Sequence, residues 1–266
     1  FEVRFAPQLH AHGGLDMEAV LRAVNKGLSR AAKKYNKLPA VVNKEEPEYM
    51  YSITVCGMRF FNEHFSAYYR DFMRVHPYSP KTEVYSMASL ELAQAAVAIR
   101  NQFHVPITGF DLAGREKGYP AEDHWPAYQY AHKNFLKKTV HAGEAYGPES
   151  IFQAITDLHA DRIGHGYYLS SPKMIKGPEI SDKEAYVRQL AEYIADRRIT
   201  IEVCLTSNMQ TNPTLKDISQ HAFKDFRAMR LSTSLCTDNR LVSNTTVTKE
   251  TMLAIKAFGL SSRELR

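Results

Sequence analysis

Seven short apolar runs alternate with longer stretches of helical periodicity along this chain of 266 residues. The runs are nearly continuous in Val, Ile, Leu, Thr and Cys, which is typical of strands buried on both faces of a parallel sheet. Strands that alternate with helices indicate repeated β/α units. The runs are Phe1–Phe5, Ser52–Phe60, Val105–Leu112, Lys138–His141, Ile163–His165, Thr200–Leu205 and Ser232–Thr237.

Longer segments between and after these runs carry apolar residues close to the 3.6-residue period of a helix. Ser86 is a candidate N-cap, and Ser181 with Glu184 three residues later forms a capping-box pattern. The predicted helices are Met17–Tyr35, Ser86–Phe103, Trp125–Leu136, Gly147–Leu158, Ser181–Arg198 and Thr248–Phe258.

Chemically active side chains lie at the carboxyl end of nearly every run, and this distinguishes two architectures that share the alternation. A (β/α)8 barrel brings all its strand ends to one mouth, whereas a doubly wound sheet brings together fewer. We therefore predict an α/β fold with a single (β/α)8 TIM-barrel domain over residues 1–266, in which seven of eight strands are visible and the first is missing. The side chains are Asp111, His141, Glu144, His165, Ser207, Asn208, Asp238 and Asn239.

The charge pattern does not indicate a nucleic-acid binder. The formal net charge is +5, and the densest basic group has the spacing of one solvent-exposed helix face. No apolar run approaches the roughly 20 residues that span a membrane. We therefore predict neither a nucleic-acid nor a membrane partner. The basic group is Arg30, Lys33, Lys34 and Lys37.

Three cysteines lie in apolar runs and form no Cys-x-x-Cys pair. They are predicted to be small buried thiols in a reducing compartment, so a cytoplasmic location is expected. The chain opens at Phe1 within a strand pattern and ends in a helical segment, and we expect both ends of the natural protein to lie outside it. The cysteines are Cys56, Cys204 and Cys236.

The segment Thr139–Glu144 places an imidazole and a carboxylate three residues apart where a strand becomes a loop. Neutral imidazole is the commonest metal ligand, and a nearby carboxylate can carry protons. A histidine held by a neighbouring backbone carbonyl explains the motif as well.

Three further segments end predicted strands in the same way. Glycines flank His165 in Arg162–Gly166 and permit a close approach. An Asp that ends a hydrophobic strand, as in Cys236–Asn239, is costly to bury unless it is paired or binds a metal. Gly109–Gly114 carries an Asp and a second Gly at a strand exit. A tight turn or an N-cap accounts for each alone, but together they indicate one hydrolytic metal centre.

These segments resemble the adenosine deaminase family of metal-dependent amidohydrolase barrels. The match covers most of the chain and follows the order of the family's motifs, and Glu2–Pro7 is similar to the family's second strand. The matching segments are Gly109–Gly114, Thr139–Glu144, Arg162–Gly166, Glu202–Asn208 and Ser234–Asn239.

The resemblance implies zinc-dependent hydrolytic deamination of adenosine to inosine and ammonia, through attack of metal-bound hydroxide on purine C6. It implies that His141 and Asp238 are ligands of one Zn²⁺ per chain. Asp238 would also hydrogen-bond the metal-bound water. Glu144 would protonate purine N1, and His165 would hold and polarise the attacking hydroxide.

Two positions would bind the purine, according to the same resemblance. The backbone amide of Gly114 would face N3. The position after the ligand Asp normally carries a second Asp that donates to N7, and here it is Asn239. An amide nitrogen donates without being a protonated acid, so the contact is retained. The partner expected is a small-molecule purine nucleoside, and the sequence sets no oligomeric state.

One departure concerns the metal. The family's first strand supplies two more ligands in a His-x-His pair, and no such strand precedes the one that begins at Phe1. His10 and His12 have this spacing, but they follow Pro7, after the second strand has ended. We expect them to form a loop and the true pair to lie upstream.

Alternative functions stay open at this stage. A sister enzyme could deaminate adenine, AMP or a modified adenosine, and Arg115 and Arg240 lie beside site motifs where they could meet a phosphate. A non-catalytic barrel could bind a nucleoside, or act as an extracellular growth factor. A two-metal amidohydrolase needs a Lys at a strand's carboxyl end, whereas Lys137 and Lys138 lie at the start of theirs.

Overall fold

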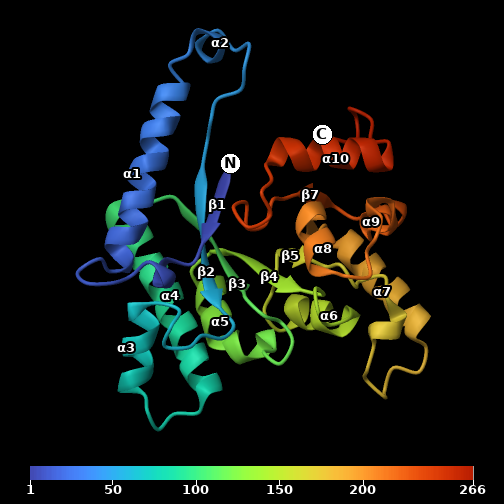
Figure 1. The fold of residues 1–266 in the computed structure, drawn as a ribbon, viewed down its shortest axis with the longest axis horizontal. Helices are drawn as coiled ribbons and strands as arrows, with labels where there is room; N and C mark the ends of the chain where they lie inside the picture. Colours follow the sequence, from blue (N-terminus) through green and yellow to red (C-terminus); the bar gives the residue numbers. More distant parts are fainter. Residues whose placement is uncertain (266) are drawn as a thin grey trace. The chain divides into compact units, whose positions relative to one another are not determined.

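The computed structural model describes residues 1–265, which contain seven parallel strands in chain order (Figure 1). All seven predicted strands are confirmed, and their order and direction are those of a partial (β/α)8 barrel, as predicted. The strands are β1 (Glu2–Phe5), β2 (Ser52–Met58), β3 (Ile107–Ala113), β4 (Lys137–Ala142), β5 (Arg162–His165), β6 (Thr200–Val203) and β7 (Thr233–Leu235).

Helices follow the strands, and the six predicted ones are present. Four more were not predicted, and three of these have seven residues or fewer. The helices within residues 1–265 are α1 (Met17–Tyr35), α2 (Pro39–Val42), α3 (Ala67–Val75), α4 (Lys81–Phe103), α5 (Trp125–Lys133), α6 (Pro148–Thr156), α7 (Lys183–Asp196), α8 (Leu205–Thr211), α9 (Phe223–Ala228) and α10 (Val247–Phe258).

The chain forms two compact units. The first comprises Phe1–Thr139 with Asp157–His159, and the second comprises Val140–Thr156 with the residues from Ala160 onward. Strand β4 passes from one unit into the other. The expectation of a single domain over residues 1–266 stays a prediction.

In the first unit, an ion pair links β1 to β3. Arg4 Nη1 lies 3.1 Å from Asp111 Oδ2, and the Asp111 side chain is fully buried. The Cys56 thiol of β2 donates to the same oxygen at 3.6 Å. A buried carboxylate needs such partners, because desolvation of an isolated charge is costly. Asp111, expected at a strand end, therefore lies inside β3 with structural partners.

Two predicted helix starts are wrong. Helix α4 begins at Lys81 after an N-cap at Pro80, and Ser86 lies inside it, because buried Val84 and Tyr85 extend the helix towards its N-terminus. Helix α7 is capped by Asp182, whose side chain accepts from Ala185 N at 2.9 Å. The residue next to the predicted cap at Ser181 thus provides the hydrogen bond.

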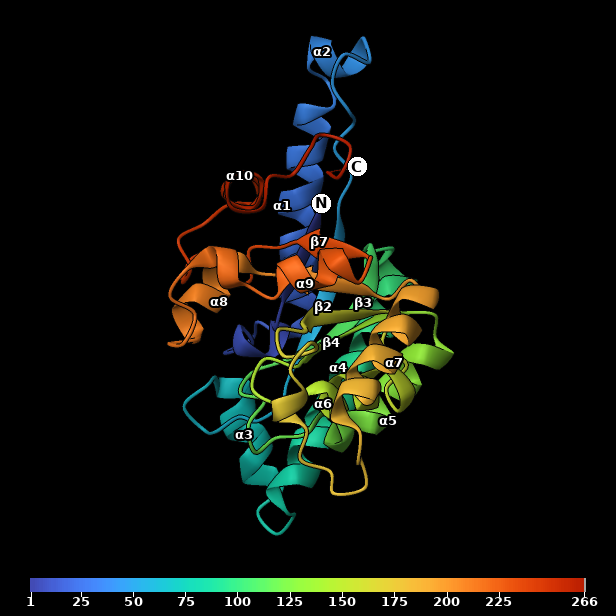
Figure 2. The same ribbon diagram turned by 90° about the vertical axis from the view of Figure 1, so that its right-hand side faces the viewer.

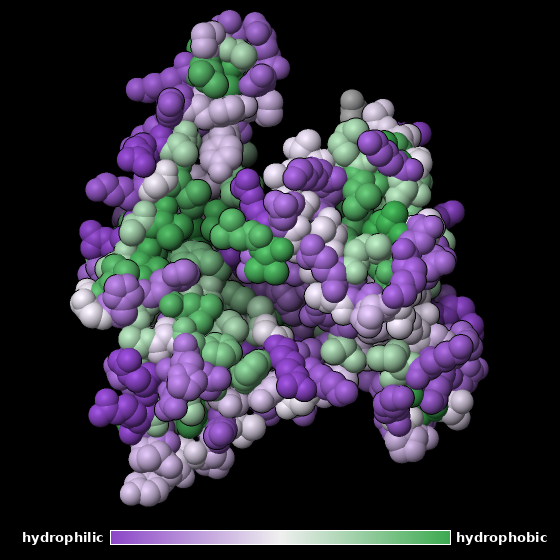
Figure 3. All heavy atoms as spheres, viewed as in Figure 1, coloured by the Kyte–Doolittle hydropathy of each residue, from purple (hydrophilic) through white to green (hydrophobic). Residues whose placement is uncertain are grey.

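Helix α1 has the bounds that its periodicity predicts, with Val20 and Leu21 buried. Polar side chains lie along its outer edge, and apolar side chains gather beside it (Figure 3). Arg30, Lys33 and Lys34 are exposed on this helix, as predicted, and Lys37 is exposed just after it.

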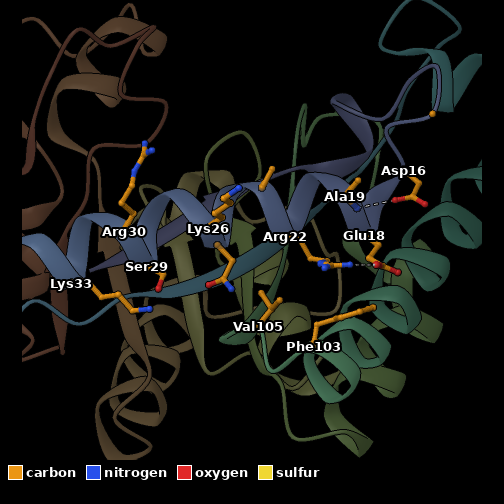
Figure 4. A pocket seen from close by; sticks show the side chains of 13 residues that line it. Asp16, Glu18, Ala19, Arg22, Lys26, Ser29, Arg30, Lys33, Phe103 and Val105 are labelled. Carbon is orange, nitrogen blue, oxygen red and sulfur yellow. Dashed lines mark hydrogen bonds and ion pairs between the residues drawn. The ribbon is translucent and has the colours of Figure 1, made fainter.

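A groove of about 860 Å³ runs beside α1 (Figure 4). Basic side chains line it, among them Lys26 and Arg30. The guanidinium of Arg22 lies 4.4 Å from the centre of the Phe103 ring and pairs with Glu18 at 2.8 Å. Glu18 of the same helix thus neutralises part of the positive charge that lines the groove.

In the second unit, β5, β6 and β7 form a parallel ladder in which Ile163 pairs with Ile201 and Val203 with Leu235. Arg162 Nε lies 3.2 Å from Oε1 of the buried Glu202 on the neighbouring strand. Helices α6 and α7 lie beside each other (Figure 2). The short β5 ends at His165, and the short β6 leads through Cys204 into α8.

The cysteine prediction holds in part. Cys56 and Cys204 are buried, whereas Cys236 is only half-buried, because it lies just after the end of β7. None of the three forms a disulfide bond within residues 1–265. In the same part of the chain, no helix combines the length and the apolar character that a membrane crossing requires.

We predict an acid-sensitive contribution from His124, which is fully buried in the first unit. Its ring contacts the Ser89 hydroxyl at 2.7 Å and the Arg59 carbonyl oxygen at 3.3 Å. Burial, together with the charge of Arg59, lowers the pKa of His124 to about 3. Below pH ~6.5 His124 therefore binds a proton in the unfolded chain but not in the folded chain. The free energy of unfolding consequently decreases as the pH falls.

The free energy of unfolding should fall by about 1.4 kcal/mol more per pH unit between pH 6 and 4 in the parent protein than in His124→Gln. Urea titrations at several pH values measure this slope. His64→Gln is the matched control, because the His64 side chain is 84% exposed. Equal slopes for the parent and His124→Gln would contradict the prediction.

Candidate active site

Three potential metal ligands from separate strands meet in the second unit. They are His141 on β4, His165 at the end of β5 and Asp238 just after β7, and their ligand atoms all lie within 4.8 Å of one another. Within residues 1–265 this is the group of His, Cys, Asp and Glu side chains whose spacing suits a metal ion. The structure thus brings together His141 and Asp238, which are 97 positions apart in the sequence numbering.

Gly164 makes room for the His141 ring. A Cβ at Gly164 would lie 3.1 Å from His141 Cγ and Nδ1 and 3.2 Å from its Cα. The imidazole therefore rests against the bare backbone of β5. The rings of His141 and His165 are 5.2 Å apart between centroids and inclined by 60°. Gly164, which precedes His165 on β5, thus makes room for the His141 ring on the neighbouring strand β4.

Two site residues have left-handed backbone conformations that non-glycine residues rarely adopt. The φ angle is +65° at His165 and +53° at Asp238. Such conformations cost free energy and are concentrated at functional sites, where the surrounding structure imposes them. Both residues lie where a strand turns into a loop.

Helix α8 supports the Asp238 carboxylate. The Ser207 hydroxyl donates to Asp238 Oδ2 at 2.7 Å. Desolvation by its surroundings would raise the pKa of Asp238, but His165, the Ser207 hydroxyl and His141 together outweigh it and lower that pKa. The carboxylate is therefore ionised at neutral pH, which is the form that binds a cation.

Glu250 of α10 holds the start of α8. Its buried carboxylate accepts hydrogen bonds from the backbone amide of Thr206 at 3.1 Å and from the hydroxyl of Thr245 at 2.7 Å. It also accepts from the Thr206 hydroxyl. These bonds fix the turn of helix that carries the next residue, Ser207.

Glu144 lies beside this group. Its Oε1 is 3.9 Å from His165 Nε2, and its side chain is 30% exposed, so solvent or a ligand can reach it. The preceding Gly143 has a φ of +74°, and a Cβ there would lie 2.6 Å from the Ile151 side chain. The loop is thus pressed against α6, and this contact positions the Glu144 backbone.

The two predicted purine contacts lie in different units. Asn239 is exposed in the second unit, and its Oδ1 accepts from Val242 N at 3.1 Å, which leaves the amide nitrogen as the group that can donate elsewhere. Gly114 lies in the first unit, directly after β3, with a φ of +102°. No side chain is tolerated easily in that conformation, so a backbone amide is the group this position offers.

The remaining sequence candidates are outside the cluster. The His10 ring is tilted by 58° against the Phe5 ring, with centroids 6.0 Å apart, and the His12 backbone bridges to Leu15. Both histidines lie in the first unit. The Lys138 amine donates to the Leu136 carbonyl at 3.4 Å, next to the start of β4.

Sequence analysis missed His221, which is fully buried and hydrogen-bonded to Asn208 at 3.0 Å. Asn208 in turn contacts His165 Nδ1 at 3.3 Å. His221 follows a 3₁₀ turn and not a strand, so no strand-end pattern marked it. Only its neighbours in space show that it belongs to the site.

We predict that Gly164→Ala weakens metal binding, because the new methyl group displaces the His141 ring. Second-sphere changes of this kind typically cost 10–100-fold in metal affinity. Metal titration monitored by calorimetry measures the loss. Gly27→Ala in α1 is the control, since a Cβ there meets no atom within 4 Å; equal affinities in both variants would refute the packing argument.

Comparisons with known proteins identify the family of this chain. Residues 79–266 match the family described as adenosine deaminase. An adenosine deaminase of Mycolicibacterium vanbaalenii is 32% identical over 265 residues, which are 99% of this chain and 62% of the relative. The chain thus spans less than two thirds of that relative's length.

Solved structures show the same fold. Adenine deaminase from Arthrobacter aurescens superimposes with a TM-score of 0.71 at 19% identity, covering 99% of this chain and 64% of that one. The N6-mAMP deaminase of arabidopsis gives a TM-score of 0.66 at 25% identity, again over 99% and 64% of the two chains.

Proposed function

Since the chain belongs to the adenosine deaminase family, we propose that it carries the catalytic centre of a hydrolase that converts a 6-aminopurine, in the first place adenosine, into the 6-oxo product and ammonia. The observation that carries this proposal is the meeting of His141, His165 and Asp238, with Glu144 beside them. Water supplies the oxygen at C6 and two protons, one for N1 and one for the departing amine.

The donor set fits a divalent metal, and we propose one Zn²⁺ per chain. His141 and Asp238 would hold it, since a mixed imidazole and carboxylate set is typical of catalytic zinc. The lowered pKa of Asp238 and its bond from Ser207 provide an ionised, fixed ligand. When bound, such a metal lowers the pKa of a coordinated water from about 16 to about 7.

Glu144 would move the protons. A carboxylic acid beside the site can deliver a proton to purine N1, which makes C6 more electrophilic and removes the ring's aromaticity as water adds. The resulting carboxylate can then accept a proton from the added water, return it to the amine as it leaves, and regain the second water proton as the C6 hydroxyl becomes the carbonyl. Its partial exposure lets a purine reach it.

His165 and Asp238 would orient the attacking water. His165 Nε2 lies 3.9 Å from Glu144 Oε1, so one small molecule can touch both. The ionised Asp238 accepts a hydrogen bond from that water and fixes the direction of its lone pair. Asn239 would bind the purine at N7, whereas the N3 contact of the Gly114 amide stays an expectation from the resemblance.

A sister activity on adenine, AMP or a modified adenosine is the second candidate. The observation in its favour is that the similar solved structures include an adenine deaminase and an N6-mAMP deaminase. Arg115 and Arg240 are both exposed and could meet a phosphate. A non-catalytic nucleoside-binding protein would not need an acid beside the ligands. We also propose a cytoplasmic location, because three cysteines without a Cys-x-x-Cys pair favour a reducing compartment.

We predict that Glu144→Gln in the complete protein lowers kcat for adenosine by about 10²–10⁴-fold, the usual contribution of a general acid. Metal content should stay near that of the parent, because Glu144 is not among the proposed ligands. Glu192→Gln on the exposed side of α7 is the matched control. Full turnover by Glu144→Gln would remove this residue from the reaction.

The substrate is tested by following the loss of the 6-amino group spectrophotometrically. Adenosine, adenine, AMP and N6-methyl-AMP are compared at equal concentration. We expect the highest kcat/KM for adenosine. A preference for a nucleotide that is abolished by Arg115→Ala or Arg240→Ala would favour the sister activity, and binding without turnover of any of the four would favour the non-catalytic alternative.

A further inference from the structure

A chain of buried hydrogen bonds runs from a backbone amide to His165. The Phe223 amide donates to His221 Nδ1 at 3.0 Å, His221 Nε2 lies 3.0 Å from Asn208 Oδ1, and Asn208 Nδ2 lies 3.3 Å from His165 Nδ1. His165, Asn208 and His221 are all at most 2% exposed. Water therefore does not compete for these bonds.

The backbone amide fixes the direction of the whole chain, because it can only donate. His221 Nδ1 must accept from Phe223 N, so the proton of neutral His221 is on Nε2. Burial, with the nearby His165, lowers the pKa of His221 to about 4, so the ring is neutral at pH 7. Its Nε2–H then donates to Asn208, and the atom that receives it must be the oxygen.

The orientation of Asn208 follows from that bond. With Oδ1 facing His221, the amide nitrogen faces His165 Nδ1 and donates to it. The reversed amide would set two donors against each other at His221, at a cost of about 1–3 kcal/mol per unsatisfied group.

We propose that Asn208 and His221 are positioning residues that hold the proton of neutral His165 on Nε2, so that His165 offers the site a hydrogen-bond donor and not a metal ligand. Its Nδ1 lone pair is used by Asn208, and its Nε2 lone pair is replaced by N–H. His165 is close enough to His141 and Asp238 to bind the same ion, so proximity alone does not assign the roles.

The consequence for chemistry rests on the proposed function, since a donor at Nε2 is useful if it holds the attacking water near Glu144. The proton position itself does not depend on it. We call the hydrogen-bond chain from Phe223 N through His221 and Asn208 to His165 the relay. Tyr167 packs edge-on against the His221 ring, with centroids 5.1 Å apart, and covers the end of the relay that lies away from His165. The relay thus begins at a backbone group and ends at the reacting centre.

The test is ¹⁵N NMR of the complete protein with labelled histidine, in which long-range ¹H–¹⁵N correlations distinguish protonated from unprotonated ring nitrogens. At neutral pH, in metal-free protein, His165 and His221 should both carry their proton on Nε2. A His165 with its proton on Nδ1 would overturn the proposal outright. This measurement needs no variant and no activity.

Asn208→Asp replaces the donor that faces His165 with an acceptor. We expect Nδ1 of His165 to become protonated, and kcat/KM of the metal-loaded enzyme to fall by about 10–100-fold. Asn212→Asp, the same change at the end of α8, should leave Nε2–H of His165 in place. An unprotonated Nδ1 of His165 in folded Asn208→Asp would contradict the relay. If the parent protein is inactive but His165 and His221 carry their protons as expected, the proposed function is contradicted and the relay is supported.

Discussion

Two consecutive residues of α8 hold the side chains on which the site depends. Ser207 donates to Asp238, and Asn208 donates to His165. The helix is itself fixed at its start by the buried Glu250. Because a hydrogen bond in a buried setting costs free energy when it is unmade, these contacts set both the position and the proton state of the groups they support.

Buried charge has a different use in the first unit. Asp111 lies on a strand of the same kind as those that lead to the site residues, yet it pairs with Arg4 and accepts from Cys56, and its side chain is fully buried. Asp238 is exposed and lies next to two imidazoles. The role of a polar residue near a strand end therefore cannot be assigned until its partners are known. The ion pair with Arg4 satisfies the Asp111 carboxylate, whereas a bound cation would satisfy the Asp238 carboxylate.

Membership of the adenosine deaminase family does not by itself fix the substrate. Proteins of this fold include an adenine deaminase and an N6-mAMP deaminase, so one barrel accommodates different aminopurines. The fold does not choose among them, because selectivity depends on groups that contact the sugar and phosphate. In this chain Asn239 stands where the resemblance leads one to expect an Asp, and its amide retains a donor.

The sequence determined the strands, most of the helices and the segments that carry His141, Glu144, His165 and Asp238, because hydrophobic periodicity and local motifs are properties of neighbouring residues. It placed the start of α4 wrongly, since the packing of Val84 and Tyr85 extends that helix. It could not find His221, because a residue that acts through a hydrogen bond to a distant partner leaves no local pattern. Only the tertiary structure decided that Gly164 makes room for His141 and that His221 is linked through Asn208 to His165, since both depend on distances between separate segments of the chain.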